Sequence, residues 1–162
     1  MRKALVCLFF FAVFLPGVSS AQGICSDRTR CSLAVDVWGV TRHQYDKNYN
    51  QKNRGLGLRA YDGRWFVAVD TMRNSVRGRA TAVGVGYEYP LFDVLGTTFL
   101  VGGELAHLDY QIPGRGTVRG NLFIPGLTIR RGRVSATIGV WPHTKRNGYV
   151  LMGFLTFSLA GL

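Results

Sequence analysis

From Val35 to Leu159 the chain is a succession of short runs, each of about ten residues, in which apolar side chains alternate with Gly, Thr, Ser or charged ones. Helical spacing is nowhere sustained along this stretch. Residues that tolerate the positive φ of a tight hairpin, such as Asp62-Gly63 and Asn147-Gly148, separate the runs. The pattern predicts eight strands, over residues 33–41, 55–61, 65–72, 79–89, 97–110, 121–129, 134–141 and 149–159.

Alternation in segments of this length is typical of a transmembrane β-barrel, and eight strands form the smallest common closed barrel. We therefore expect an all-β fold, an eight-stranded antiparallel transmembrane β-barrel that occupies residues 22–162 as a single domain. A soluble, lipocalin-like barrel with its apolar face turned inward has the same alternation. That alternative stays open at the level of sequence.

The first residues indicate export. Arg2 and Lys3 precede the apolar run 4–15, and Ser19-Ser20-Ala21 supplies the small residues that a signal peptidase recognises. Residues 1–21 are therefore predicted to be a signal peptide. The apolar run is shorter than the roughly 20 residues that a membrane-spanning helix needs. An export signal followed by a barrel pattern predicts a bacterial outer-membrane location.

The chain is strongly basic. The formal net charge of +11 becomes +9 for residues 22–162, because the predicted signal carries Arg2 and Lys3 and no acidic residue. Nucleic acid is not expected as a partner, since the chain is exported and has no recognition motif. Most Lys and Arg fall in predicted turns and loops, where a barrel meets phosphate-bearing lipid headgroups. The alternative is that these charges only solvate the loops.

Cysteine usage predicts one disulfide. Cys7 lies inside the signal, and the exported chain keeps Cys25 and Cys31 in a polar segment, where an oxidising compartment favours their pairing. Two thiols alone do not fill a tetrahedral metal shell, and no paired histidines lie nearby. Neither a metal site nor a cofactor is expected.

Several strand residues indicate what the barrel interior holds. Gly55 and Gly57, and likewise Gly84 and Gly86, alternate on one face and are expected to leave a cavity. Glu104 interrupts an apolar strand, so we expect it to point inward and to pair with an arginine from another strand. The aromatic residues expected in interface belts or at the lipid-facing surface are Trp38, Trp65, Trp141, Phe154 and Phe157.

Two prolines break the strand pattern. Pro125 falls inside the predicted strand 121–129, and Pro142 follows the predicted strand 134–141. Each lacks an N–H group and deletes a ladder hydrogen bond, and an unpaired backbone group in lipid costs several kcal/mol. Prolines on adjacent strands predict a gap in the wall. The alternative is that both lie near strand ends, outside the hydrocarbon.

Polar residues follow the first and third predicted strands, at Thr41-Arg42-His43 and Arg73-Asn74-Ser75. Antiparallel order brings both segments to the same rim. Here most of residues 38–158 resembles the lipid A palmitoyltransferase (PagP) family. The resemblance rests on Tyr45-Asp46-Lys47, Tyr49-Asn50 before Gly55-Leu56-Gly57, Asn74-Ser75 after Ala68-Val69, Val85-Gly86-Tyr87, Ile124-Pro125 and Trp141-Pro142.

The resemblance implies a monomeric outer-membrane barrel whose lumen holds one acyl chain of a phospholipid. Lipid enters such barrels through wall gaps, which implies a substrate-binding role for Pro125 and Pro142. Family members transfer palmitate from a glycerophospholipid to lipid A and use an essential His, Asp and Ser. Ser75 matches the serine, His43 is the candidate histidine, and Asn74 stands where the aspartate is expected.

The chemistry of acyl transfer requires a base, a nucleophile or oxyanion donor, and a group that orients the base. His43 suits the base, because an imidazole titrates at about pH 6.5. Ser75 could act as the nucleophile or as the donor. Asn74 can orient groups but cannot carry the charge that stabilises an imidazolium, and Asp46 or Asp70 could supply that carboxylate. The alternative function is a non-catalytic barrel that binds lipid or a surface partner.

Overall fold

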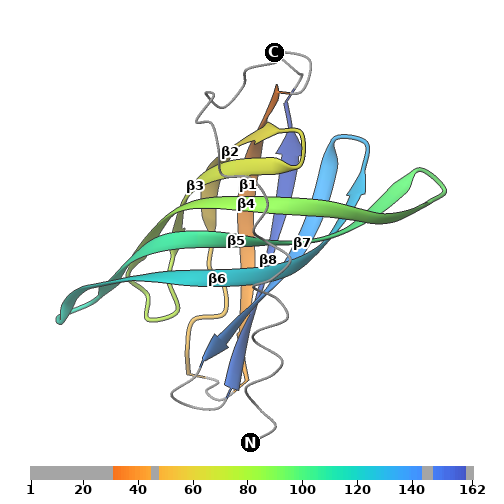
Figure 1. Ribbon diagram of the computed structural model, residues 1–162. Coiled ribbons are helices and arrows are strands. Elements are labelled where there is room, and N and C mark those ends of the chain that lie inside the picture. The colour runs from red at the N-terminus through yellow and green to blue at the C-terminus, as the bar shows by residue number, and fades with distance from the viewer. Residues whose placement is uncertain (1–30, 45–47, 144–147, 160–162) are drawn as a thin grey trace, which may run out of the picture.

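The computed structural model describes residues 31–44, 48–143 and 148–159. Eight antiparallel strands follow one another around a barrel, and pairing of the last with the first closes it. Figure 1 shows β4, β5 and β6 side by side, crossing β1, β7 and β8 in this view. The strands are β1 (Cys31–His43), β2 (Gly55–Asp62), β3 (Trp65–Arg73), β4 (Arg79–Val94), β5 (Thr97–Ile112), β6 (Gly116–Arg131), β7 (Val134–His143) and β8 (Gly148–Ser158).

The predicted strands and their order are confirmed, and β4 and β6 extend furthest beyond their predicted bounds. Strand β4 continues past Pro90 to Val94, because a register shift against β5 absorbs the proline. Strand β6 begins at Gly116 in place of residue 121, because its glycine-rich start pairs fully with β5. The predicted signal peptide lies outside the described residues.

The outer wall of the barrel carries large apolar side chains, and the lumen buries charged ones. Asp36 and Arg59 are fully buried in the lumen, whereas Leu58 on the outer face is 65% exposed. Leu58, Val69 and Val83 form one outward apolar row through the register of β2, β3 and β4. The lipocalin-like alternative is therefore wrong, because such a barrel turns its apolar face inward. This distribution is that of a transmembrane barrel.

No helix within the described residues is long and apolar enough to cross a bilayer.

A layer of buried charges fills the middle of the lumen. The Arg59 guanidinium donates from Nε to Asp36 Oδ2 at 2.9 Å and from Nη2 to Glu104 Oε2 at 3.4 Å. Its Cζ lies 4.0 Å from the Phe66 ring centroid, and Thr156 donates to the other Asp36 oxygen at 2.6 Å. Glu104 thus points inward and pairs with an arginine, as the sequence predicts.

Gly84 and Gly86 do not line an empty space. A Cβ built on Gly84 would overlap the Glu104 side chain, and one on Gly86 would overlap the Phe66 ring. These glycines make room for large side chains that reach across from neighbouring strands. The expectation that they mark the cavity is wrong, because the volume they free is filled.

The expected positions of the aromatic residues need correction. Trp65 and Phe157 face outward, 52% and 39% exposed, but Trp38 and Phe154 lie in the lumen, 6% and 9% exposed. Trp141 is half-buried and lines the cavity described below. Trp38 lies two residues after a buried carboxylate, and residues two apart on a strand share a face.

Cys31 at the start of β1 is disulfide-bonded and buried. Cys25 lies outside the described residues, so the Cys25–Cys31 pairing stays a prediction.

Candidate functional site

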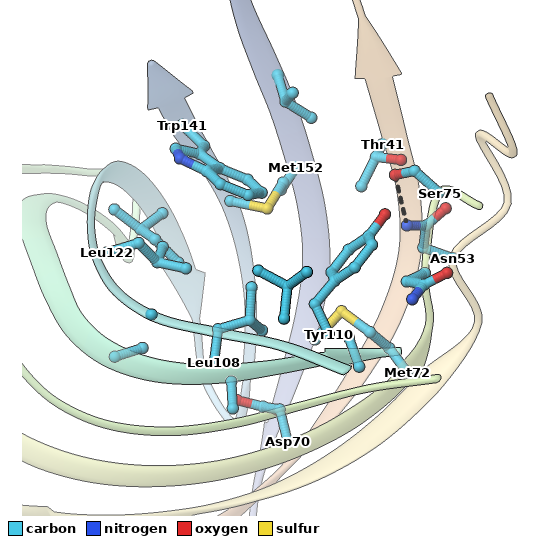
Figure 2. A pocket seen from close by; sticks show the side chains of 18 of the residues that line it. Thr41, Asn53, Asp70, Met72, Ser75, Leu108, Tyr110, Leu122, Trp141 and Met152 are labelled. Carbon is cyan, nitrogen blue, oxygen red and sulfur yellow. Dashed lines mark hydrogen bonds between the residues drawn. The ribbon is translucent and has the colours of Figure 1, made fainter. Parts of the chain in front are cut away.

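A cavity of about 400 Å³ occupies the lumen between the layer of buried charges and one rim of the barrel. Figure 2 shows Asp70 at one end of this cavity and Thr41, Asn53 and Ser75 at the other. Most of the wall between is apolar. The apolar lining includes Met72, Ala80, Ala82, Leu108, Val150 and Met152.

The mouth of the cavity holds the candidate base and the candidate nucleophile together. His43 Nε2 and Ser75 Oγ lie 2.7 Å apart, and each residue is 8% exposed. Asn53 Nδ2 donates to the same Ser75 oxygen at 3.5 Å (Figure 2). The Tyr49 ring lies against the imidazole, with 4.8 Å between centroids. Residues 32 positions apart thus form one hydrogen-bonded pair.

A bulge in β1 turns His43 into the lumen. Below it, Asp36 and Trp38 face inward, so uninterrupted alternation would direct His43 outward. The pairing of β1 with β8 shifts register between Trp38 and Val40, which leaves Gly39 unpaired. The extra residue exchanges the two faces of the strand, and His43 becomes buried.

Asn74 is 1% exposed and uses both ends of its amide within the turn that presents Ser75. Its Oδ1 accepts hydrogen bonds from the backbone N–H groups of Val76 at 3.2 Å and Gly78 at 2.8 Å, and its Nδ2 donates to the carbonyls of Arg79 at 3.1 Å and Gln111 at 2.6 Å. Asn74 therefore holds the shape of the turn. Its predicted catalytic role stays a prediction.

The two other candidate carboxylates differ in position. Asp70 Oδ1 accepts a hydrogen bond from the Trp38 indole at 2.7 Å, at the end of the cavity opposite Ser75 (Figure 2). The structure therefore does not bring Asp70 to His43. Asp46 lies outside the described residues.

The wall of the barrel is open beside the cavity. The ladder between β6 and β7 ends at the pair Gly126–Gly139, although β6 itself begins at Gly116. Pro125 is the first residue beyond that pair, and Pro142 lies beyond it on β7. A gap bordered by both prolines is thus present. The cavity reaches it through Leu122, Ile124 and Trp141.

Sequence reasoning missed two polar residues at the cavity mouth. Asn53 comes from a polar loop in which nothing distinguishes it. Tyr110 on β5 points its hydroxyl toward Ser75 (Figure 2). Its face could have been predicted, because Tyr110 lies an even number of residues from the inward Glu104. Thr41, part of the predicted polar set, is 3% exposed there, and its hydroxyl has no hydrogen-bond partner among the described residues.

Within the described ranges, no cluster of three or more His, Cys, Asp and Glu side chains could hold a metal ion.

No protein-family model matches the chain, and no curated protein matches it. The crystal structure of the N-terminal β-barrel domain of Pseudomonas aeruginosa OprF is similar at 16% sequence identity and a TM-score of 0.45, covering 79% of this chain and 97% of that one. The assignment of the fold here rests on the strand pairing itself, which closes the barrel.

Proposed function

We propose that this chain is an outer-membrane acyltransferase that moves a fatty acyl chain, palmitate, from a glycerophospholipid to lipid A and acts as a monomer. The observation that carries the proposal is the His43–Ser75 hydrogen bond of 2.7 Å at the mouth of an apolar cavity. A base bonded to a hydroxyl beside an acyl-sized apolar space suits ester chemistry on a lipid.

The exterior supports residence in a bilayer. The outward faces of the strands carry large apolar residues that would be costly to expose to water. The connections from β2 to β3, β4 to β5 and β6 to β7 are tight turns, whereas residues 44–54 form a long connection at the other end. Outer-membrane barrels place short turns in the periplasm, so the mouth with His43 and Ser75 would face the cell exterior.

The cavity and the open wall suit a lipid substrate. An acyl chain would lie in the apolar lumen, with the ester carbonyl at the level of Ser75 and the headgroup outside. The gap between β6 and β7 would admit the chain sideways from the bilayer, because no ladder hydrogen bonds have to break above Gly126 and Gly139. Pro125 and Pro142 would keep that gap open by lacking N–H donors.

The transfer needs one proton to move at His43 Nε2. In the route through Ser75, Oγ attacks the ester carbonyl carbon while Nε2 takes the hydroxyl proton, and that proton then leaves with the lysophospholipid oxygen. The acceptor hydroxyl next loses its proton to Nε2, attacks the acyl-serine and restores Ser75. Thr41 and Asn53 lie beside Ser75 and would donate to the oxyanion.

Mass spectrometry of lipid A tests the proposal. Cells that express the chain should show lipid A with one added palmitoyl mass, and cells that express Ser75→Ala should not. A folded Ser75→Ala barrel, recognised by heat-modifiable gel mobility, is the matched control for loss of chemistry without loss of structure. Unchanged lipid A in the wild-type cells would reject acyl transfer to this acceptor.

Deletion of Gly39 and Val40 together should abolish acyl transfer while the barrel still closes. Thr41 would then follow Trp38 and take the outward place of Val40, so that His43 turns outward, away from Ser75. Lipid A analysis and heat-modifiable mobility measure the two effects separately. The matched control is deletion of Gly39 alone, which should keep activity, because Trp38 and Val40 already pair with the neighbouring residues Phe154 and Gly153 of β8 and His43 stays inward. Activity in the double-deletion variant would show that the face of β1 does not position the base.

A non-catalytic lipid-binding barrel is the second candidate. The observation that favours it is Asn74, whose amide is engaged in the turn and carries no charge to stabilise an imidazolium. Such a barrel would take up phospholipid in the same cavity and leave lipid A unchanged.

A further inference from the structure

Three arginine side chains form a row on the outer surface, next to the cavity mouth. Arg73 on β3 pairs directly with Arg79 on β4, and the Arg73 N–H donates to the carbonyl of Arg54 at 2.9 Å. All three are exposed. They face out of the barrel, because the adjacent Met72 and Ala80 line the lumen cavity.

The arginine row has no counter-charge among the described residues. The ion pairs among the described residues take their basic partner from Arg59, Arg119, Arg130 and His107. None of these pairs includes Arg54, Arg73 or Arg79. Like charges directly opposite on neighbouring strands repel one another. An anion between the guanidinium groups would remove that repulsion. Arg77, also exposed, adds a fourth positive charge from the turn that carries Ser75.

The height of the row on the barrel indicates what kind of anion it meets. The next outward positions below it are Leu56 and Thr71, and the apolar row of Leu58, Val69 and Val83 follows. The arginines thus lie just above the apolar exterior, at the level of lipid headgroups. A surface hollow between these strands is lined by the same arginines together with Thr71 and Gln111, which can donate further hydrogen bonds.

We propose that Arg54, Arg73 and Arg79 bind a phosphate group of the acceptor glycolipid, lipid A, in the outer leaflet. A guanidinium donates two parallel hydrogen bonds to a phosphate, which favours phosphate over a zwitterionic headgroup. This inference rests on the proposed function for the identity of the ligand. The site would hold a phosphorylated sugar beside the turn of residues 74–78, so that an acceptor hydroxyl could reach Ser75.

Binding to lipid A in detergent micelles tests the site without turnover. The Ser75→Ala barrel is titrated with lipid A, and complexes are counted by native mass spectrometry. Adding Arg54→Gln, Arg73→Gln and Arg79→Gln should weaken binding on the order of 100-fold, since each surface arginine near a lipid phosphate contributes a factor of about five to the affinity. Enzymatically dephosphorylated lipid A should bind the Ser75→Ala barrel with all three arginines as weakly as intact lipid A binds the triple variant. The matched control changes three exposed arginines at the other rim, Arg64, Arg131 and Arg133, to Gln and should bind normally.

Three results would overturn the proposal. Equal losses in the two triple variants would indicate general charge attraction, and competition by phosphatidylglycerol at equal concentration would indicate a phospholipid site. Normal lipid A binding by the variant that lacks Arg54, Arg73 and Arg79 would show that these arginines do not form a binding site. The test does not require acyl transfer, so unchanged lipid A in cells would reject the proposed function and leave the phosphate site standing.

Discussion

Replacing His43 by alanine should lower the rate of acyl transfer by roughly 10²- to 10⁴-fold, the range in which general bases act. His43 Nε2 is hydrogen-bonded to Ser75 Oγ at 2.7 Å, so the imidazole is the group in position to take the serine or acceptor proton. The measurement is the transfer of a labelled acyl chain from phospholipid to lipid A by the refolded barrel.

The double variant His43→Ala/Ser75→Ala provides the sharper measurement. If the two side chains act as one unit, the second substitution should cause little further loss. Losses that multiply would mean that the residues act independently. Heat-modifiable mobility should be normal in all three variants, because His43 lies at the rim and outside the layer of buried charges. An active, folded His43→Ala barrel would remove the imidazole from the mechanism.

Replacing Asp36 by alanine should lower the free energy of unfolding by about 3 to 5 kcal/mol. Asp36 is fully buried and holds Arg59 Nε at 2.9 Å, so its removal leaves a buried guanidinium with the longer contact to Glu104 at 3.4 Å. Thr156 would lose its acceptor as well. Urea titration of the refolded barrel in lipid vesicles, followed by tryptophan fluorescence, measures the change.

The matched control removes the stranded charge. Asp36→Ala/Arg59→Met/Glu104→Gln, which also neutralises the carboxylate that Arg59 pairs with, should recover most of the lost stability, because the cost of the single change comes from an uncompensated buried charge and not from a lost net attraction. A single variant within about 1 kcal/mol of the wild type would show that water reaches Arg59. Both variants should keep the His43–Ser75 pair, which lies on the far side of the cavity.

Much of the barrel could be predicted because its signals are local. Alternation identified the strands, and Asp62-Gly63 identified a turn, which the positive φ of Gly63 confirms. The inward direction of Glu104 followed from a charge in an apolar strand. The wall gap followed from Pro125 and Pro142, since a missing N–H is a property of the residue itself.

Other features depended on partners distant in sequence. The space freed by Gly84 and Gly86 is filled by Glu104 and Phe66 from neighbouring strands, and no local pattern reports what lies opposite a glycine. The role of Asn74 was equally hidden, because one of its hydrogen bonds goes to Gln111 on another strand.

The amino-acid sequence by itself determined the eight-stranded barrel, the shared rim at which His43 and Ser75 lie, and the two prolines of the open wall. Only the tertiary structure decided that His43 meets Ser75. That contact depends on the unpaired Gly39, which exchanges the faces of β1, and a bulge exists only relative to the strand beside it. Alternation assigns a face to each residue along one strand, whereas the register between strands decides which faces meet.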